Sequence, residues 1–335
     1  MKKILTIALL FSSIVAVAQR TAQVAISTGV VNYVGDLGHE KYFPYSSAST
    51  GTAITIRDFI NDPKRSGTKF AVLDMQLRFS WHRLQYDEVN PIGDEHGNDL
   101  RNYRRGIGFR NDLYGAEVGF TYNIYPNRFA PLAKLKYCFF LSAGVGAFYG
   151  QPKADLFNGA AEMQNRYYNW SDGSIHDIAE NPKDPGNEIK KDGDYETNLR
   201  DWLTEGQGYH PENNSTKTYS NVNIGLPVGG GIRYIYNKQL TFSAEFNYYF
   251  LLTDYIDDVS NRYATYDEIR SSFPNAEKFE MAKYISDPSG KGTTGVSSIA
   301  SRRGNVDTND AFTYVSIEAA YKLVWKKKGV YGQGR

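Results

Sequence analysis

The segment Leu240–Leu252, which reads LTFSAEFNYYFLL, decides the fold of this chain. Every second residue from Leu240 onward is apolar or aromatic, while the intervening positions start with Thr241, Ser243 and Glu245. This period of two is typical of a β-strand, because successive side chains of a strand point to opposite faces. The segment is also longer than the usual strand of about five or six residues. A tilted strand of about nine to eleven residues is long enough to cross a bilayer.

The same alternation recurs along the chain and predicts seven further strands. They cover Val24–Val34, Thr52–Ile60, Phe70–Arg83, Leu113–Ile124, Lys136–Tyr149, Val222–Tyr236 and Ala311–Trp325. Connections near 61–67, 126–131 and 237–238 are short, whereas those near 35–50, 85–111, 151–219 and 254–310 are long. Short turns at one end and long loops at the other are typical of outer-membrane barrels. The sequence therefore predicts an all-β fold, an eight-stranded antiparallel transmembrane up-and-down β-barrel with short periplasmic turns and long extracellular loops.

The two faces of these strands favour a membrane barrel over a soluble barrel or sandwich, which would also alternate. One face carries large apolar residues with almost no charge, and tyrosines such as Tyr122, Tyr137 and Tyr321 stand beside the short turns, where an interfacial girdle lies. The other face is mixed, with small residues and charges of both signs. An eight-stranded barrel is wide enough only for side chains, so we expect these charges to form a lumen network that leaves no wide pore: Arg57, Asp74, Arg78, Glu117, Lys136, Arg233, Glu245, Glu318 and Lys322.

The N-terminal residues and the composition suggest an exported protein. Residues 1–18 have a basic start, an apolar stretch and an Ala-Val-Ala end, the pattern of a cleaved signal peptide, which leaves 19–335 for the barrel domain. The chain has 38 Lys and Arg against 37 Asp and Glu, a net charge of +1, and this balance gives no reason to expect a nucleic-acid partner. A single cysteine, Cys138, excludes an internal disulfide framework and a cysteine-based zinc site.

The search for catalytic or cofactor chemistry finds little, so we expect no enzyme, no cofactor and no metal centre. The five histidines lack metal-ligand spacing, and no nucleophile elbow, P-loop or dinucleotide motif occurs. His82 is expected among the lumen charges. The spacing of His82, Asp254 and Ser260 gives no support to a catalytic site at the rim of the barrel. Asp254, Asp257 and Asp258 follow the seventh strand closely. They could bind a divalent cation, but capping a turn and pairing with Arg262 or Arg303 is favoured.

A set of motifs, in order along nearly all the chain after residue 18, resembles the PorG family of outer-membrane barrels from the type IX secretion system of Bacteroidota. The resembling segments are 32–37 (NYVGDL), 105–112, 204–208 (TEGQG), 226–231 (LPVGGG), 253–260 (TDYIDDVS) with Tyr263, 303–305, 309–310 and the closing strand. The order of these segments, and no single one, carries the resemblance. The long polar loop around 181–186 departs from the family pattern.

The resemblance implies a barrel without catalytic residues that associates with a periplasmic ring built from a PorK-like lipoprotein and a PorN-like protein. We therefore expect a non-enzymatic structural component of that machinery, with outer-membrane lipid and these ring proteins as partners. Basic turns and the tail Lys326–Lys328 suit an acidic partner surface. The first alternative is a stand-alone surface barrel whose long loops bind host or matrix ligands. The second alternative, less favoured, is a rim enzyme acting on lipids or peptides.

Overall fold

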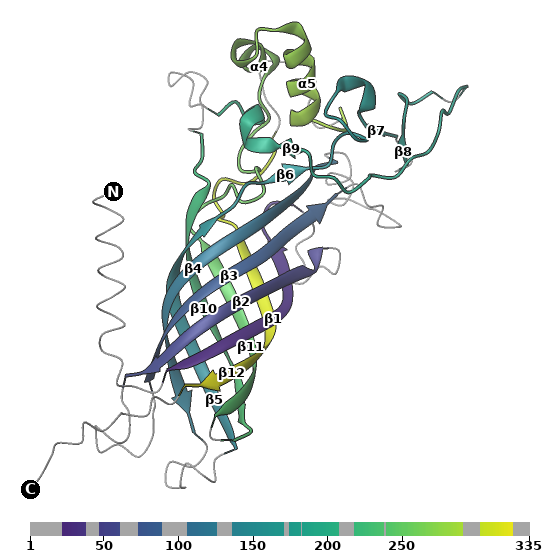
Figure 1. Ribbon diagram of the computed structural model, residues 1–335. Helices are drawn as coiled ribbons and strands as arrows, with labels where there is room; N and C mark the ends of the chain where they lie inside the picture. The colour runs from purple at the N-terminus through teal and green to yellow at the C-terminus, as the bar shows by residue number, and fades with distance from the viewer. Residues whose placement is uncertain are drawn as a thin grey trace, which may run out of the picture.

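The computed structural model contains a closed barrel of eight long strands in which each strand pairs antiparallel with its neighbours (Figure 1). The structure describes residues 22–37, 47–60, 73–88, 106–125, 136–170, 174–181, 183–207, 218–237, 239–290 and 302–323. The barrel strands are β1 (Gln23–Val34), β2 (Ser49–Phe59), β3 (Leu73–Asp87), β4 (Gly108–Ile124), β5 (Tyr137–Tyr149), β10 (Val222–Ile235), β11 (Leu240–Leu251) and β12 (Ala311–Lys322). Pairing of β12 with β1 closes the barrel. The predicted eight-stranded antiparallel up-and-down barrel is confirmed.

The alternating pattern of each strand separates an apolar outside from a polar inside. Ile26, Leu141 and Ile317 are 64%, 59% and 69% exposed on the outer wall, whereas Arg57 and Arg78 are each 1% exposed inside. This arrangement reverses that of a water-soluble barrel, in which charged side chains cover the outside. At the end where β1 begins and β12 ends, called the turn end, Tyr122, Tyr137, Tyr236 and Tyr321 are also exposed.

The paired strands β3 and β4 run furthest beyond their sequence patterns. β3 reaches Asp87 and β4 starts at Gly108, and the two remain paired along this extension. The extension lies at the opposite end of the barrel, called the cap end. Pro227 lies within β10 without a shift of register, since Gly225 is opposite Gly146 and Val228 is opposite Ala143. Proline has no N–H to donate, and the ladder to β5 lacks only the pairs at Leu226 and Pro227.

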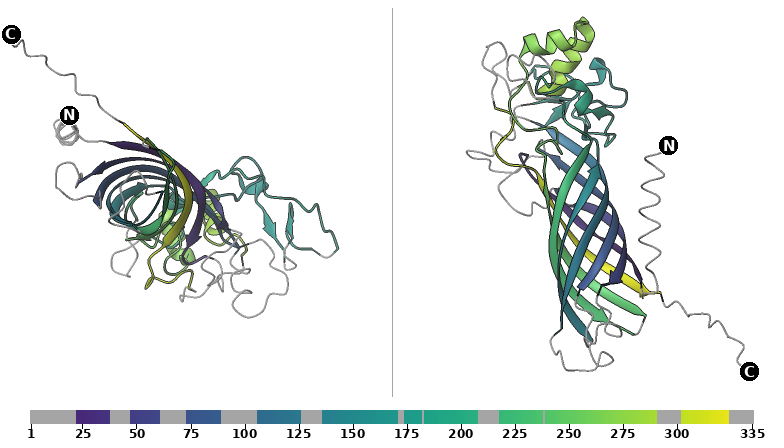
Figure 2. Two further views of the ribbon diagram at one scale, coloured as in Figure 1. Left: turned by 90° about the horizontal axis from the view of Figure 1, so that it is seen from below. Right: turned by 90° about the vertical axis from the view of Figure 1, so that its left-hand side faces the viewer.

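The long connections at the cap end fold into a cap above the lumen (Figures 1 and 2). The connection from β5 to β10 contains β6 (Lys153–Ala154), η3 (Met163–Asn165), β7 (Tyr168–Asn169), β8 (Ile175–His176), β9 (Thr197–Asn198) and η4 (Leu199–Trp202). The connection from β11 to β12 contains two helices, α4 (Tyr266–Ser272) and α5 (Ala276–Ser286). β6 pairs with β4 at Arg110, and this pairing continues the barrel sheet into the cap.

Each of the two α-helices in the cap begins just after a residue whose side chain binds a free backbone amide in the first turn of the helix. Thr265 and Glu268 form a reciprocal capping box on α4, and the Asn275 side chain accepts from the first amides of α5. No helix within the described ranges is long and apolar enough to span a bilayer. Residues 1–18, Trp325, the tail Lys326–Lys328 and most of the short turns lie outside the described residues.

Candidate functional site: a filled lumen and a folded cap

Near the turn end, the lumen is crossed by a bidentate ion pair. Arg57 on β2 donates to Glu318 on β12 through Nη1 to Oε1 at 2.5 Å and through Nη2 to Oε2 at 2.6 Å. Neither side chain is more than 1% exposed. Two parallel N–H···O bonds between planar groups are among the stronger interactions in proteins. The pair connects two strands that are separated in the sheet by β1.

A second cluster occupies the middle of the lumen. Arg78 Nη2 lies 2.8 Å from Glu245 Oε1, and its Nη1 donates to the Tyr249 hydroxyl at 3.3 Å. Glu117 accepts from the Ser80 hydroxyl at 3.0 Å and from Tyr249 at 3.4 Å. Tyr249 therefore joins Arg78 to Glu117, while Glu245 binds Arg78 directly, and all four side chains are buried. Such groups are costly to bury unless their hydrogen-bonding atoms are satisfied.

A third pair lies close to the turn end on the other side of the lumen. Arg233 Nη1 lies 3.1 Å from Asp74 Oδ2 and 2.6 Å from Asn123 Oδ1, and the Asn123 amide donates back to Asp74 at 3.0 Å. The guanidinium carbon also lies 4.3 Å from the centre of the Phe140 ring. Together the three clusters fill the cross-section of a barrel whose interior is only wide enough for side chains.

The prediction that nine charged residues form the lumen network is wrong for Lys136 and only partly correct for Lys322. Lys136 precedes the first residue of β5 and is exposed, so it lies outside the lumen network. Lys322 is the last residue of β12 and is only half-buried. Both stand at the rim of the turn end, where a long lysine side chain can reach water. The other seven predicted lumen charges are buried.

Three polar partners in and above the lumen were not predicted: Tyr33, Asn123 and Tyr249. All three are buried. A signal was present for Asn123 and Tyr249, because each falls on the mixed face of its alternating strand together with Glu117 or Glu245. Their pairing partners depend on how far neighbouring strands are staggered, which the period of a single strand does not give.

His82 lies in an aromatic layer at the cap end of the lumen and not in the charge network where it was expected. It is fully buried, and its ring centre lies 5.4, 5.2 and 4.7 Å from those of Tyr249, Phe312 and Tyr314. Neither ring nitrogen has a hydrogen-bond partner among the described residues. A general base must reach the proton that it removes, and His82 is enclosed on three sides by rings. This position gives no support to a rim catalyst based on His82.

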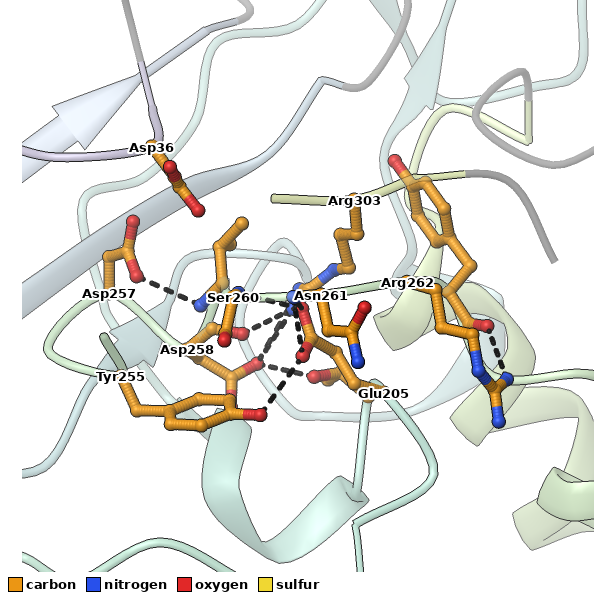
Figure 3. A network of polar contacts seen from close by, with 12 residues as sticks. Asp36, Glu205, Tyr255, Asp257, Asp258, Ser260, Asn261, Arg262 and Arg303 are labelled. Carbon is orange, nitrogen blue, oxygen red and sulfur yellow. Dashed lines mark hydrogen bonds and ion pairs between the residues drawn. The ribbon is translucent and has the colours of Figure 1, made fainter. Parts of the chain in front are cut away.

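At the base of the cap, a buried arginine joins two loops (Figure 3). Arg303 Nη1 lies 3.4 Å from Asp258 Oδ2 and 3.5 Å from Glu205 Oε1, and it also donates to the Asp258 carbonyl. Asp258 accepts further bonds from Thr204 and Tyr219, each at 2.6 Å. Its φ of 69° lies in the left-handed region, which aspartate tolerates better than most residues. Burial raises the pKa of Asp258, and Arg303 opposes that rise.

The other two aspartates of the loop motif have different surroundings. Asp257 accepts from the Tyr33 hydroxyl and, at 2.8 Å, from the Val259 amide. Asp254 is buried, and Asp36 and Glu205 are close enough to add like charge. Arg262 does not pair with the motif, because its guanidinium binds Glu268 at 2.6 Å. Among the residues that the structure describes, no group of three Asp, Glu, His or Cys side chains is placed to hold a metal ion. The geometry therefore favours the turn-and-arginine arrangement over a cation site.

We expect the cap to lose stability as the pH rises from about 5 to about 8. Burial raises the pKa of Asp254 to about 8 and that of Glu205 to about 7. Within this range the folded cap holds protons that the unfolded loop releases, so unfolding becomes easier with increasing pH. Protection factors for hydrogen exchange in 254–260 should fall between about pH 6 and pH 8.5, and Asp254→Asn should reduce that fall. An unchanged pH dependence in Asp254→Asn would contradict this assignment.

Comparisons with known proteins give distant structural likenesses. No protein-family model matches the chain, and no curated protein sequence matches it. Neisserial surface protein A is 10% identical with a TM-score of 0.36, covering 90% of this chain and 97% of that one. Ail, the attachment invasion locus protein of Yersinia pestis, is 8% identical with a TM-score of 0.32, covering 91% and 99%. A major outer membrane protein from Thermus thermophilus is 10% identical with a TM-score of 0.32, covering 90% and 99%.

These likenesses carry no argument about what the chain does. Each TM-score is below 0.5 and each identity is 10% or less. The barrel assignment rests on the strand pairing of this chain itself.

Proposed function

We propose that the chain is an outer-membrane barrel with a closed lumen that serves as a non-enzymatic structural component of a membrane assembly. The observation that carries this proposal is the inverted distribution of side chains, apolar on the outer wall and ion-paired inside. Hydrocarbon offers no hydrogen-bond partners, so a spanning sheet must close on itself, as this one does. A lumen filled with paired charges supports a structural function over solute transport.

The finer proposal is membership of the type IX secretion machinery, with PorK-like and PorN-like ring proteins as partners at the turn end. Its support is the ordered set of PorG-like motifs in the sequence. Two further features of the chain suit it. Lys136 is exposed at the turn end, and the sequence of the C-terminal tail adds Lys326–Lys328. A basic rim suits an acidic partner surface, since complementary charges increase the rate and specificity of association.

Two measurements test these statements separately. Purified barrel in planar lipid bilayers is expected to show no steady conductance, and an open channel would contradict the closed lumen. Mild detergent extraction of the native membrane, followed by affinity purification and mass spectrometry, is expected to recover ring components. Recovery of the barrel alone would contradict the secretion assignment and would leave the closed barrel unaffected.

A second candidate function is a surface barrel whose loops bind host or matrix ligands. The observation that favours it is the folded cap, in which α5 packs with α4 and with η4 and is hydrogen-bonded to the connection from β5 to β10. A long loop with its own helices is more than a connection between strands requires. If this function holds, altering the cap changes adhesion and leaves secretion intact.

A further inference from the structure

The cap contains a small polar pocket between α5 and the chain on both sides of the β7–β8 hairpin. Its volume is about 350 Å³, and its walls come from 166–169, 179–180, Tyr266, Glu280, 283–284 and 287–290. This volume is at the lower end of the range for ligand pockets, about 300–1,000 Å³. Both α5 and β7, which contribute residues to the pocket, lie in the cap, away from the barrel wall (Figure 1). Neither the lumen network nor the Arg303 cluster contributes to it.

The floor of the pocket is held rigidly by Tyr284. Its hydroxyl donates to the Leu156 carbonyl at 2.7 Å, lies 3.2 Å from the Tyr167 carbonyl, and accepts from the Tyr167 amide at 3.1 Å. These bonds tie α5 to a segment more than one hundred residues away in sequence. Tyr284 is 7% exposed and Tyr167 2% exposed. The pocket is therefore built by tertiary contacts, and a ligand would meet a preformed shape, which lowers the ordering cost of binding.

Arg166 lines this pocket and has no acidic partner among the residues that the structure describes. Its guanidinium carbon lies 4.3 Å from the centre of the Tyr168 ring and 5.8 Å from that of Tyr284. Its side chain has no ion pair or hydrogen bond with any residue that the structure describes. The other cation, Lys283, is paired with Glu280 at 2.9 Å. The Tyr168 ring lies close to the Arg166 guanidinium, and the N–H groups of this guanidinium remain for a planar oxyanion.

The remaining walls define what else the ligand must offer. The carboxylates of Glu180 and Asp287 line the pocket, and a carboxylate has several acceptor sites, so it can accept from a hydroxyl in addition to the bonds that it already has. Tyr266 is 38% exposed and supplies an amphipathic ring. A ligand that satisfies all of these has one carboxylate, several hydroxyl groups and an apolar ring face. We propose that the pocket binds a carboxylate-bearing sugar unit, such as a uronic acid, of a glycan outside the cell.

Two other ligand classes fit less well. A highly sulfated or phosphorylated polymer would bring several negative charges close to Glu180 and Asp287, and like charges at short distance disfavour binding. A uronic acid brings a single negative charge, which Arg166 can bind. A peptide with a free C-terminal carboxylate could use Arg166, but an apolar side chain would find few apolar groups besides the tyrosines. The proposed ligand does not depend on the secretion assignment, because the ligand binds in the cap and the proposed ring proteins bind at the turn end.

Titration calorimetry on the full-length barrel in detergent micelles tests the proposal with two probes, methyl glucuronide and methyl glucoside. We expect the glucuronide to bind at least tenfold more tightly, because only it carries the carboxylate for Arg166. Arg166→Gln should lower glucuronide affinity at least tenfold, and Arg166→Lys should recover only part of it, since an ammonium cannot form two parallel bonds.

Arg270→Gln is the matched control, because the Arg270 guanidinium also lies over a ring, 4.6 Å from the centre of Phe279, but outside the pocket. It should bind the glucuronide like the original chain. Equal affinity for the two sugars, or full glucuronide affinity in Arg166→Gln, overturns the proposal. Tighter binding of a short peptide with a free C-terminus than of the glucuronide overturns the ligand class. Recovery of ring components in the affinity purification is independent of all these results.

Discussion

Arg57→Met is expected to destabilise the barrel by about 3–5 kcal/mol, because it leaves the buried Glu318 carboxylate without its cation. Without Arg57, the Glu318 carboxylate keeps, among the described residues, only a weak hydrogen bond, from the Ser243 hydroxyl at 3.5 Å. Urea titration of the barrel folded in lipid vesicles, followed by tryptophan fluorescence, measures the change. The midpoint should shift at nearly constant slope, which indicates a change of stability without a change in the surface exposed on unfolding.

The double variant Arg57→Met/Glu318→Met separates the buried charge from the loss of packing. Replacing both members of a buried ion pair by apolar side chains of similar volume is often neutral or stabilising. The double variant should therefore be much closer in stability to the original barrel than Arg57→Met alone. Equal losses in the single and double variants would show that the packing of Arg57, and not the pair, stabilises the lumen.

The period of two predicted most of the barrel because alternation is a local property of a strand. The segment 240–252 became β11 with its start at Leu240 and its end one residue earlier, at Leu251. The same phase placed Arg78 and Glu245 inside and Leu141 and Ile317 outside. The exception, Lys136, precedes a strand, where the alternation no longer determines the environment of a side chain.

The pairing of charges across the lumen could not be predicted in the same way. Arg57 meets Glu318 across an intervening strand, and Asp74 on β3 meets Arg233 on β10. Which inward residues come to the same height depends on strand tilt and stagger around the whole barrel. A single strand pattern contains no information about that stagger.

The cap was missed as a folded unit although local signals for its helices were present. Thr265 followed by Glu268 is a capping-box pattern, and Asn275 precedes the second helix. Both helices are short, however, and helices of this length form mainly through packing. Tertiary contacts that hold them come from distant residues, such as the Leu156 carbonyl, which accepts from the Tyr284 hydroxyl. The Arg166 pocket depends on the same contacts and leaves no recognisable motif in the sequence.

Arg303→Met should open the base of the cap while leaving the barrel folded. Arg303 is 1% exposed and is the cation shared by Glu205 and Asp258, which come from two different loops. Removing it leaves two buried carboxylates without a cation, at a cost of about 3–5 kcal/mol. Hydrogen exchange in 199–207 and 254–263 should accelerate by at least about a hundredfold, because local opening follows local stability. Exchange in β11 should not change, since the substituted contacts lie outside the barrel strands.

Arg262→Met is the matched control for this loss. Its partner Glu268 lies in the same cap, but the Arg262 side chain is 27% exposed, and a partly exposed pair contributes about 1 kcal/mol or less. The pH dependence adds a second criterion. Burial already raises the pKa of Glu205 to about 7 despite Arg303, so the cap of Arg303→Met should recover protection as the pH falls and the carboxylates become neutral. A loss that is equal in the two variants, or that does not shrink at acidic pH, would mean that Arg303 stabilises the cap through packing and not through its charge.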